Sequence, residues 1–382
     1  TGHGGYTISN SLFSGNSAGN GGAIYADGDV MKITNSKFSA NSAEYLGGAI
    51  RIASGLMNEI RDSLFEGNIA GTRGGAIHVL SRDYMVMQIF DTDFINNIAG
   101  QNGGAMYIAL DLNNGHIDFI SSDGTVHKIS GNVQGYNINN DPDWWMSETS
   151  NGLFIEKGEV NLKTQGNDSK WVIDDIIEGS SKWDMDNAKL NISSSKTTNK
   201  DGVVVTGGSI TLNNQVKNLI LTHQSGTLLL TGDKISNGAS ILQDVDLFIS
   251  PDNSGADLKF NLANGKIDKL LIRNLSITKP TGEQKLLIAL DVNLKEGISD
   301  YLEVTQAMSG NIAFNSDYFE FNILEDGDAD KFQLFNRDFP FSENGEVIQY
   351  TDLAKYVFTI GEDGYINVTK EDTSGLPEAV AS

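Results

Sequence analysis

The sequence contains no cysteine and only 5 prolines among its 382 residues. Without cysteine there is no disulfide framework, no thiolate nucleophile, no Cys-x-x-Cys redox pair and no cysteine zinc site. Basic residues are also scarce, because 27 Lys and Arg stand against 50 Asp and Glu and the formal net charge is −23. A chain this acidic repels phosphates and anionic lipid headgroups, so we expect no nucleic-acid partner.

Long apolar runs are missing as well. The best run, residues 286–292, already includes Asp291, whereas a membrane helix needs roughly 18 apolar residues without charges. We therefore expect no transmembrane segment. The chain begins at Thr1 without an initiator methionine or a signal-like segment, so we expect any export signal to lie outside it.

Two short motifs recur together four times in the N-terminal part of the sequence. The first is Phe-x-x-Asn, whose phenylalanines are 25, 27 and 29 residues apart, and the second is Gly-Gly-Ala followed by Ile or Met. Two coupled motifs that advance together indicate a tandem-repeat architecture. The repeat residues are Phe13, Asn16, Gly22, Ala23, Ile24, Phe38, Asn41, Gly48, Ala49, Ile50, Phe65, Asn68, Gly75, Ala76, Ile77, Phe94, Asn97, Gly104, Ala105 and Met106.

The residues after each glycine pair alternate between inward and outward types, as in Ile50-Arg51-Ile52. Alternation with period two predicts a strand. An isoleucine also precedes each motif Phe by five positions, at Ile8, Ile33, Ile60 and Ile89. One repeat cannot bury its apolar face alone, but stacked repeats would pair their strands and join their inward side chains into one core. The sequence therefore predicts an all-β fold, a parallel β-helix (β-solenoid).

The motif residues then have structural explanations. Paired glycines permit a tight corner with positive φ before a strand begins. The motif asparagines stand at the end of the Phe strand, where Asn tolerates a left-handed conformation and its amide can bond the turn backbone. Stacked at equivalent corners, these amides could form a ladder. We assign the motif residues mainly to the scaffold.

The paired motifs resemble the repeats of the polymorphic membrane proteins of chlamydiae, and more broadly the right-handed β-helical passengers of type V autotransporters. The resemblance implies a pectin-lyase-like right-handed parallel β-helix. It also implies an exported, surface-displayed passenger with adhesive roles, in which the Gly-Gly-Ala-Ile and Phe-x-x-Asn repeats take part in binding host cells.

Beyond the four copies, Ile129-Ser130-Gly131-Asn132 has the form of a fifth copy with Ile in place of Phe. We divide the chain into a repeat β-helix, a loop excursion, degenerate coils that end in a capping hairpin, and a flexible tail. At roughly 20 to 25 residues per coil, the chain would form about 15 to 19 coils. The four parts span residues 1–132, 133–152, 153–370 and 371–382.

Catalytic signatures are weak. None of the 5 histidines stands in a metal-spaced pair, and Ser193-Ser194-Ser195-Lys196 matches the Ser-x-x-Lys pattern without its accompanying motifs. Asp91 and Asp93, near Arg82 in sequence, could contribute to a polysaccharide-active site, but strand alternation sends both carboxylates to one solvated face. We expect no catalytic residue, no cofactor and no metal.

The best candidate for binding is a row of outward residues, one from each repeat: Tyr25, Arg51, His78 and Tyr107. Equivalent residues on stacked coils form a ridge, and Tyr and Arg are enriched at contact surfaces. The row is either a contact surface or simply a solvent-facing row. Trp144 and Trp145 are either a binding platform or buried packing residues.

The sequence thus favours a non-catalytic passenger, secreted or displayed at the cell surface on the extracellular face of a bacterial outer membrane. It would act as an adhesin or structural stalk through multivalent contacts with a host-cell or matrix protein or a glycan. Two alternatives remain open. One is a carbohydrate-active β-helix enzyme, a polysaccharide lyase or hydrolase, and the other is a biofilm-type adhesin that associates with copies of itself.

Overall fold

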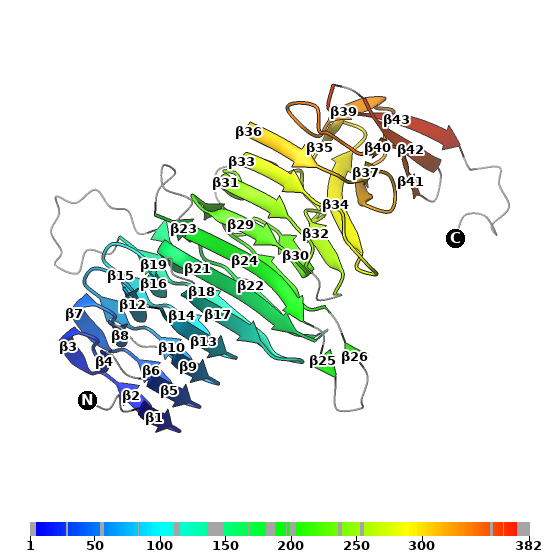
Figure 1. Cartoon of the computed structure of the whole chain (residues 1–382). Coiled ribbons are helices and arrows are strands. Elements are labelled where there is room, and N and C mark those ends of the chain that lie inside the picture. The colour runs from blue at the N-terminus through cyan, green and yellow to red at the C-terminus, as the bar shows by residue number, and fades with distance from the viewer. Residues whose placement is uncertain are drawn as a thin grey trace, which may run out of the picture.

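The structure is a computed structural model, and the regular elements of the residues that it describes are all β-strands. Figure 1 shows them stacked as successive coils from the N-terminal end to a separate small sheet at the C-terminal end. The structure describes residues 5–27, 30–53, 57–82, 84–110, 115–135, 149–166, 168–180, 188–195, 197–198, 204–205, 207–235, 239–252, 256–351, 354–361 and 363–372.

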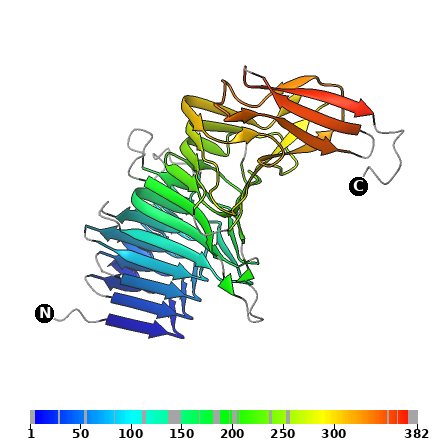
Figure 2. The same cartoon turned by 45° about the vertical axis from the view of Figure 1, so that its right-hand side comes forward.

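The first and largest sheet has 17 strands, which pair in parallel with their equivalents one coil away. Figure 2 shows this stack from a second angle, with the strands of successive coils lying side by side. Its strands are β1 (Gly5–Ser9), β4 (Ile24–Ala26), β5 (Val30–Thr34), β8 (Ile50–Ile52), β9 (Met57–Arg61), β12 (Ile77–Ser81), β13 (Val86–Phe90), β16 (Met106–Leu110), β17 (His116–Ser121), β21 (Leu153–Gln165), β23 (Ile177–Gly179), β24 (Ala188–Ser195), β28 (Val216–Lys217), β29 (Ile220–His223), β31 (Leu242–Ile249), β33 (Lys269–Ile277) and β36 (Tyr301–Gly310).

The second sheet contains the strands of the Phe-x-x-Asn motifs and their later equivalents. It is parallel except for the pairing of β34 with β35. Its strands are β2 (Leu12–Ser14), β6 (Lys37–Ser39), β10 (Leu64–Glu66), β14 (Asp93–Ile95), β18 (Val126–Ser130), β22 (Lys170–Ile173), β27 (Ser209–Leu212), β30 (Gly226–Leu230), β32 (Leu258–Asn261), β34 (Leu286–Asn293), β35 (Ile298–Ser299) and β38 (Phe319–Glu325).

The third sheet is confined to the N-terminal coils and closes each of them between the Asn corner and the glycine pair. One antiparallel pairing, between β19 and β20, ends it. Its strands are β3 (Ser17–Asn20), β7 (Ser42–Leu46), β11 (Ile69–Ala70), β15 (Ile98–Ala99), β19 (Val133–Gln134) and β20 (Thr149–Ser150), and a separate two-stranded pair is formed by β25 (Thr197–Thr198) and β26 (Val204–Val205).

The motif phenylalanines lie directly over one another inside the coils. The ring centroids of Phe13 and Phe38 are 4.8 Å apart, as are those of Phe38 and Phe65, and the step to Phe94 is 5.1 Å. The next residue in this column is Ile129, which pairs with Phe94. The predicted stacking of the four repeats is therefore confirmed, and Ile129 continues the column as a fifth copy.

Both glycines of each pair are required, for different reasons. The first glycine has a positive φ, 58° at Gly21 and 66° at Gly47, which L side chains rarely adopt. At the second glycine, a Cβ on Gly48 would stand 2.1 Å from the carbonyl oxygen of Gly75. The corner is thus tight enough that backbone from the next coil occupies the space of a side chain.

The motif asparagines form the amide ladder that the repeat predicts. Asn68 is fully buried, and its Oδ1 accepts hydrogen bonds from the backbone N–H of Asn41 at 3.1 Å and from the Nδ2 of Asn41 at 2.9 Å. Its own Nδ2 donates to Asn97 Oδ1 at 2.9 Å and to the Phe38 carbonyl at 3.0 Å. The left-handed residue of this turn is the one before each asparagine, for example Gly67 with φ 62°. The expectation that Asn itself adopts that conformation is wrong.

The ladder ends on a carboxylate. Asn97 donates to Asn132, and Asn132 donates from its backbone N–H and from Nδ2 to Asp175 Oδ2, at 3.0 and 2.7 Å. The other oxygen of Asp175 accepts from the Ser150 hydroxyl at 3.0 Å. A carboxylate only accepts hydrogen bonds, so it can close a chain of amides that all donate in one direction.

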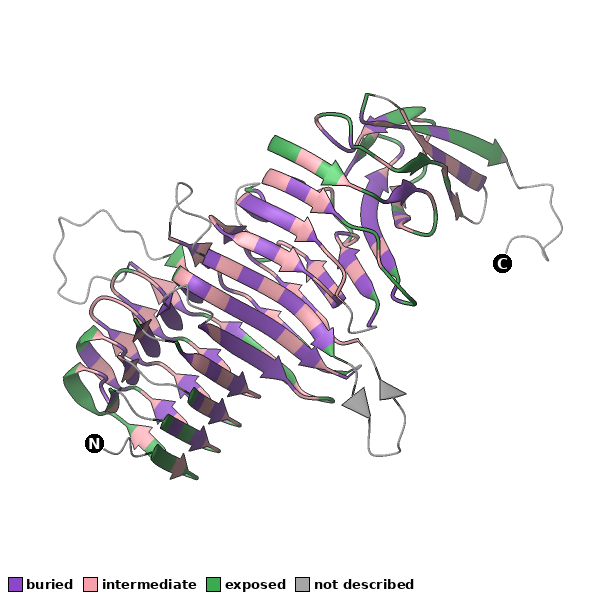
Figure 3. Ribbon diagram, viewed as in Figure 1, coloured by how far each residue is buried: buried purple, intermediate pink, exposed green. Residues whose placement is uncertain are grey.

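The isoleucines that precede each Phe form a second inward column, in which Ile8, Ile33 and Ile60 lie in register. Figure 3 shows buried positions alternating with less buried ones along the strands, as period-two alternation requires. Burial is complete at Ile33 and Ile60 but only partial at Ile8, which belongs to the first coil.

The coils differ in length along the chain, and one late coil spans only 18 residues, between the paired Leu212 and Leu230. Equivalent residues are 25 positions apart in the first coils, whereas Ser130 and Asp174 are 44 apart. The structure therefore has about ten coils, and the expected 15 to 19 is wrong. The physical reason is that insertions between strands lengthen a coil without adding one.

A four-stranded antiparallel sheet covers the C-terminal end of the stack. It includes the predicted hairpin, in which Phe358 pairs with Val368, and Phe358 packs against Phe321 of the last coils with centroids 4.7 Å apart. The predicted β-solenoid with a C-terminal capping hairpin is confirmed. The sheet consists of β39 (Lys331–Gln333), β41 (Glu346–Tyr350), β42 (Ala354–Ile360) and β43 (Tyr365–Asp372), and β37 (Ala313–Phe314) pairs with β40 (Glu343–Asn344) beside it.

The ladder generates a stability prediction. Asn68→Ala should lower the free energy of unfolding by about 3 to 5 kcal/mol, because it leaves buried donors and acceptors of Asn41, Asn97 and Phe38 unpaired. Asn16→Ala, at the exposed first rung, should cost less than about 1 kcal/mol. Chemical denaturation of both variants measures the difference. Equal losses at the two positions would contradict a buried, cooperative ladder.

Asp175 generates a second prediction. Burial raises the pKa of Asp175, even though Asn132 and Ser150 donate hydrogen bonds to its carboxylate. With a raised folded-state pKa, stability is fully present below the unfolded value of about 3.9 and decreases as the pH rises. Asp175→Asn keeps the acceptor and removes the charge, so it should stabilise the protein more at pH 7 than at pH 3. Denaturation at both pH values, with exposed Asp168→Asn as the control, tests this, and a pH-independent difference would refute it.

Candidate functional site

The predicted contact row is a continuous column of paired residues. Tyr25 on β4 pairs with Arg51 on β8, which pairs with His78 on β12 and then Tyr107 on β16. Beyond the prediction, the column continues to Phe154 on β21. The side chains touch one another, since the Arg51 guanidinium lies 5.2 Å from the Tyr25 ring centroid and the His78 and Tyr107 rings are stacked at 5.0 Å.

Exposure changes steeply along this column. Tyr25 is 51% exposed, but His78 and Tyr107 are only 2% and 1% exposed. The expectation that all four face solvent is therefore wrong for His78 and Tyr107. Tyr107 is enclosed because Phe154 stacks on it with centroids 5.7 Å apart, while Arg73 lies 4.9 Å over its ring and donates a hydrogen bond to its hydroxyl at 3.1 Å.

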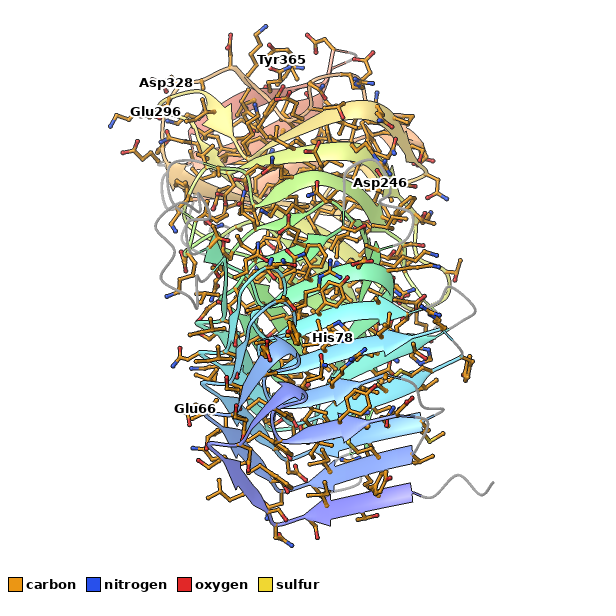
Figure 4. The ribbon with its side chains drawn as sticks, turned by 90° about the vertical axis from the view of Figure 1, so that its left-hand side faces the viewer. Glu66, His78, Asp246, Glu296, Asp328 and Tyr365 are labelled. Atoms are coloured by element: carbon orange, nitrogen blue, oxygen red, sulfur yellow. The ribbon has the colours of Figure 1, made fainter. Side chains whose placement is uncertain are left out.

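The open part of the column is thus the end formed by Tyr25 and Arg51. The positive charge of the column comes from Arg51 and, closer to Tyr107, from Arg73. Burial and the two neighbouring guanidinium groups lower the pKa of His78 to about 3, so this imidazole is neutral at physiological pH. Figure 4 shows His78 on the broad strand face and Glu66 at the border of the coils, so the column and the second sheet lie on different sides of the solenoid.

A groove with a volume of about 680 Å³ follows the corner between the first and second sheets across the first coils. One wall is formed by residues in left-handed conformation, with φ between 44° and 51°, at Asn10, Asn35, Asp62 and Asp91. These residues stand at the same corner of successive coils. The structure therefore forms a polar row at this corner. The repeat motifs do not predict it, because the residue type at this position differs between coils.

The groove is closed at one end by a change in coil width. The second-sheet strand has three residues in β14 but five in β18, and the longer strand brings His127 into the corner. Its Nε2 lies 3.2 Å from Asp91 Oδ1, and its Nδ1 lies 3.3 Å from Asp93 Oδ1. Asp91 also accepts hydrogen bonds from the backbone N–H and the hydroxyl of Ser122, at 2.8 and 2.6 Å.

Electrostatics favour the charged forms of this cluster. Burial alone would lower the pKa of His127, but the carboxylates of Asp91 and Asp93 raise it to about 9. Burial would likewise raise the pKa of Asp91, but hydrogen bonds from His127 and Ser122 lower it to about 2. The cluster is an imidazolium held between two carboxylates. Asp91 is consequently not the solvated surface residue that alternation predicts, and among the described residues neither Asp forms an ion pair with Arg82.

The sequence does contain a signal for this cluster. The fifth-copy residue Ile129 pairs with Phe94, so the register places His127 opposite Thr92, between Asp91 and Asp93. Histidine spacing along the chain does not show this, because the partners lie more than thirty residues apart. Only the repeat register relates them.

The comparison with protein families bears on the repeats themselves. The family described as the Chlamydia polymorphic membrane protein (Chlamydia_PMP) repeat matches residues 10–27 and 62–80. The chain carries repeats of this type. Both matched segments begin at the corner residue of the groove and extend into the strand that carries the contact column. No curated protein matches the chain.

The other candidate residues do not converge with these features. Trp144 and Trp145 lie outside the described residues, and Trp171 is fully buried in the core. The serines of Ser193–Ser195 belong to β24, whereas Lys196 is not among the described residues. In the described part of the chain, no group of three or more His, Asp or Glu side chains is arranged to hold a metal ion.

Membrane crossing by a helix finds no support in the part of the chain that is described. None of its elements is a helix with the length and hydropathy that a bilayer span demands.

The His127 cluster generates a pH-dependent prediction. Since the pKa rises from about 6.5 in the unfolded chain to about 9 in the folded one, the added stability is present below pH 6.5 and is lost as the pH rises through 9. His127→Gln should lower the free energy of unfolding by roughly 2 kcal/mol at pH 6 and by much less at pH 10. Denaturation curves at both pH values measure this.

Asp93→Asn serves as the companion variant, because it keeps the imidazole and removes one of its two carboxylate partners. It should reproduce part of the loss at pH 6. If His127→Gln destabilised the protein equally at both pH values, the ion cluster would not be the source of the effect.

Proposed function

We propose that this chain is a non-catalytic passenger, displayed at a bacterial cell surface or secreted, that works as an adhesin by presenting rows of side chains along a stiff solenoid. The observation that carries the proposal is the register of the repeats. Every coil places an equivalent residue above the last, so a single outward position becomes a row of four or five side chains. The match to Chlamydia polymorphic membrane protein repeats supports display at the surface.

The repeat motif residues themselves would not make the contacts. Phe38, Phe65 and Phe94 are fully buried, as are Asn41, Asn68 and Asn97. Their role is to hold the register, because each stacks on or bonds to its equivalent. Binding attributed to these motifs would therefore act through the outward residues next to them, such as Tyr25 and Arg51.

The exposed end of the column suits contact with a protein or a glycan. Tyr and Arg provide a planar apolar surface together with several hydrogen-bond donors, and both are enriched where binding energy concentrates. Each contact would be weak by itself. Copies of the chain displayed together would add these contacts through multivalency, which raises avidity without new chemistry.

The charged groups in the groove support a non-catalytic role. Hydrolysis of a glycosidic bond uses two carboxyl groups that flank the bond, one as acid and one as base or nucleophile. Here Asp91 and Asp93 both contact His127, and the Lys37 ammonium lies 2.7 Å from Glu66. These ionic groups compensate one another, which favours display over turnover.

Binding of the purified chain to host cells tests this proposal. Beads coated with the chain should adhere to cultured epithelial cells, to immobilised matrix proteins or to a glycan array. The double variant Tyr25→Ala/Arg51→Ala should reduce that adhesion at least fivefold, because it removes the open end of the column. Lys32→Ala is the matched control, since it removes an exposed cation from another row of the same sheet.

Three outcomes would overturn parts of the proposal. Absence of adhesion to all three targets would remove the adhesin role, and release of sugars from a polysaccharide panel would replace it with catalysis. Concentration-dependent sedimentation that the double variant abolishes would point to self-association instead of binding to a host.

A further inference from the structure

We propose that the corner groove binds a linear, uncharged glycan that lies along the solenoid axis, with its end against His127. This goes beyond the contact column, which lies on another face. It rests on the adhesive function proposed above, because it names a ligand class for the same rod. The groove spans the first four coils and is closed by the fifth.

The floor of the groove is a row of hydroxyl groups whose own bonding is complete. The backbone N–H of Ser36 donates to the Ser63 hydroxyl at 3.1 Å, and the Ser36 hydroxyl donates to the Thr34 carbonyl at 2.9 Å. Ser36 and Ser63 are buried. The floor is consequently rigid and preformed, which reduces the entropy lost when a ligand binds.

One wall is a row of polar corner residues, and the facing wall alternates aliphatic and charged side chains, in the order Leu12, Lys37, Leu64 and Asp93. Asn10, Asn35 and Asp62 are exposed, and their left-handed backbone holds the amides and the carboxylate at the corner. Opposite them are Leu12, which is 68% exposed, and Leu64. A pyranose ring has hydroxyl edges and C–H faces, so its C–H faces can pack on Leu12 and Leu64 while its hydroxyl groups bond to the corner amides and to the polar groups between the leucines.

The spacing of the coils suits a repeating chain molecule. Successive coils stand 4.8 Å apart at the Phe stack, so four coils provide roughly 15 Å of groove. This step is close to the rise per ring of an extended β-linked glycan. An extended peptide advances about 3.3 Å per residue and would lose register with the coils.

Backbone pairing also disfavours a peptide. Peptides commonly bind a solenoid or sheet by adding a strand to an edge with unpaired N–H and C=O groups. The strands that border the groove already pair with the coils on either side, as β6 does with β2 and β10. The groove therefore offers side chains but no free backbone edge.

The carboxylates of the groove disfavour the binding of acidic glycans. Asp62, Asp91 and Asp93 line the groove together with the cations Lys37 and His127, and the whole chain carries a formal charge of −23. Like charges repel over a Debye length of about 8 Å in physiological salt. Sulfated or uronic-acid chains should bind much more weakly than neutral ones.

Titration calorimetry with purified chain and defined tetrasaccharides tests the proposal. Cellotetraose and chitotetraose serve as neutral probes, and a heparin tetrasaccharide serves as the anionic probe. At least one neutral probe should bind, and the heparin probe should bind at least tenfold more weakly. Leu64→Ala should weaken the binding of the neutral probe about tenfold, because it removes an aliphatic side chain that lines the groove.

Ile69→Ala is the matched control, since Ile69 is a half-buried aliphatic residue on the neighbouring strand β11 and does not line the groove. Thermal unfolding of both variants verifies that they are folded. Equal weakening by Leu64→Ala and Ile69→Ala, failure of every neutral probe, or preference for heparin would overturn the groove assignment. Competition by an extended peptide that Leu64→Ala abolishes would overturn the glycan class.

The two proposals fail in distinguishable ways. Bead adhesion that persists in Leu64→Ala while no tetrasaccharide binds would leave the adhesin role and remove the glycan groove. Tetrasaccharide binding without adhesion to any cell or matrix target would keep the groove and remove the adhesin role.

Discussion

Vertical registration of equivalent residues is the constraint on which the rest of this structure depends. Parallel pairing between coils sets a step of about 4.8 Å, so a side chain at a paired position stands directly over its equivalent in the next coil. Identical residues satisfy this condition best when they stack, as the Phe rings do, or when each donates to the next, as the asparagines do. Contacts between equivalent positions of successive coils therefore explain why the residues repeat. Where a residue departs from the repeat, a column of stacked side chains ends or changes in composition.

Asp175 and His127 are two such departures, and both are ionisable residues. Asp175 replaces an amide where the ladder stops, and His127 appears where the second-sheet strand widens from three residues to five. A regular solenoid presents the same surface along its whole length. Features that could distinguish one position from another, such as a closed groove end, arise only where successive coils differ in width or composition.

The division between inward and outward positions also separates stability from binding. Beyond the first coil, the inward motif residues are fully buried and contact one another, so substitutions there report on folding. Outward residues can present their side chains to solvent, but the exposed fraction differs along a row. Tyr25 is exposed, whereas Tyr107 is covered by Arg73 and Phe154. A row that is uniform in sequence register is thus not uniform as a surface.

The sequence by itself determined the β-helical repeat, because the spacing of Phe13, Phe38, Phe65 and Phe94 is a local pattern that only a stacked coil can bury. It also determined the tight glycine corner and the amide ladder, which depend on residue type at one repeated position. Only the tertiary structure decided the number of coils, the burial of His78 and Tyr107, and the widening of β18 that brings His127 into contact with Asp91 and Asp93, although the repeat register already placed these three residues at one corner. Those features depend on the width of each coil and on which neighbour covers it, and insertions of variable length conceal both from a linear pattern.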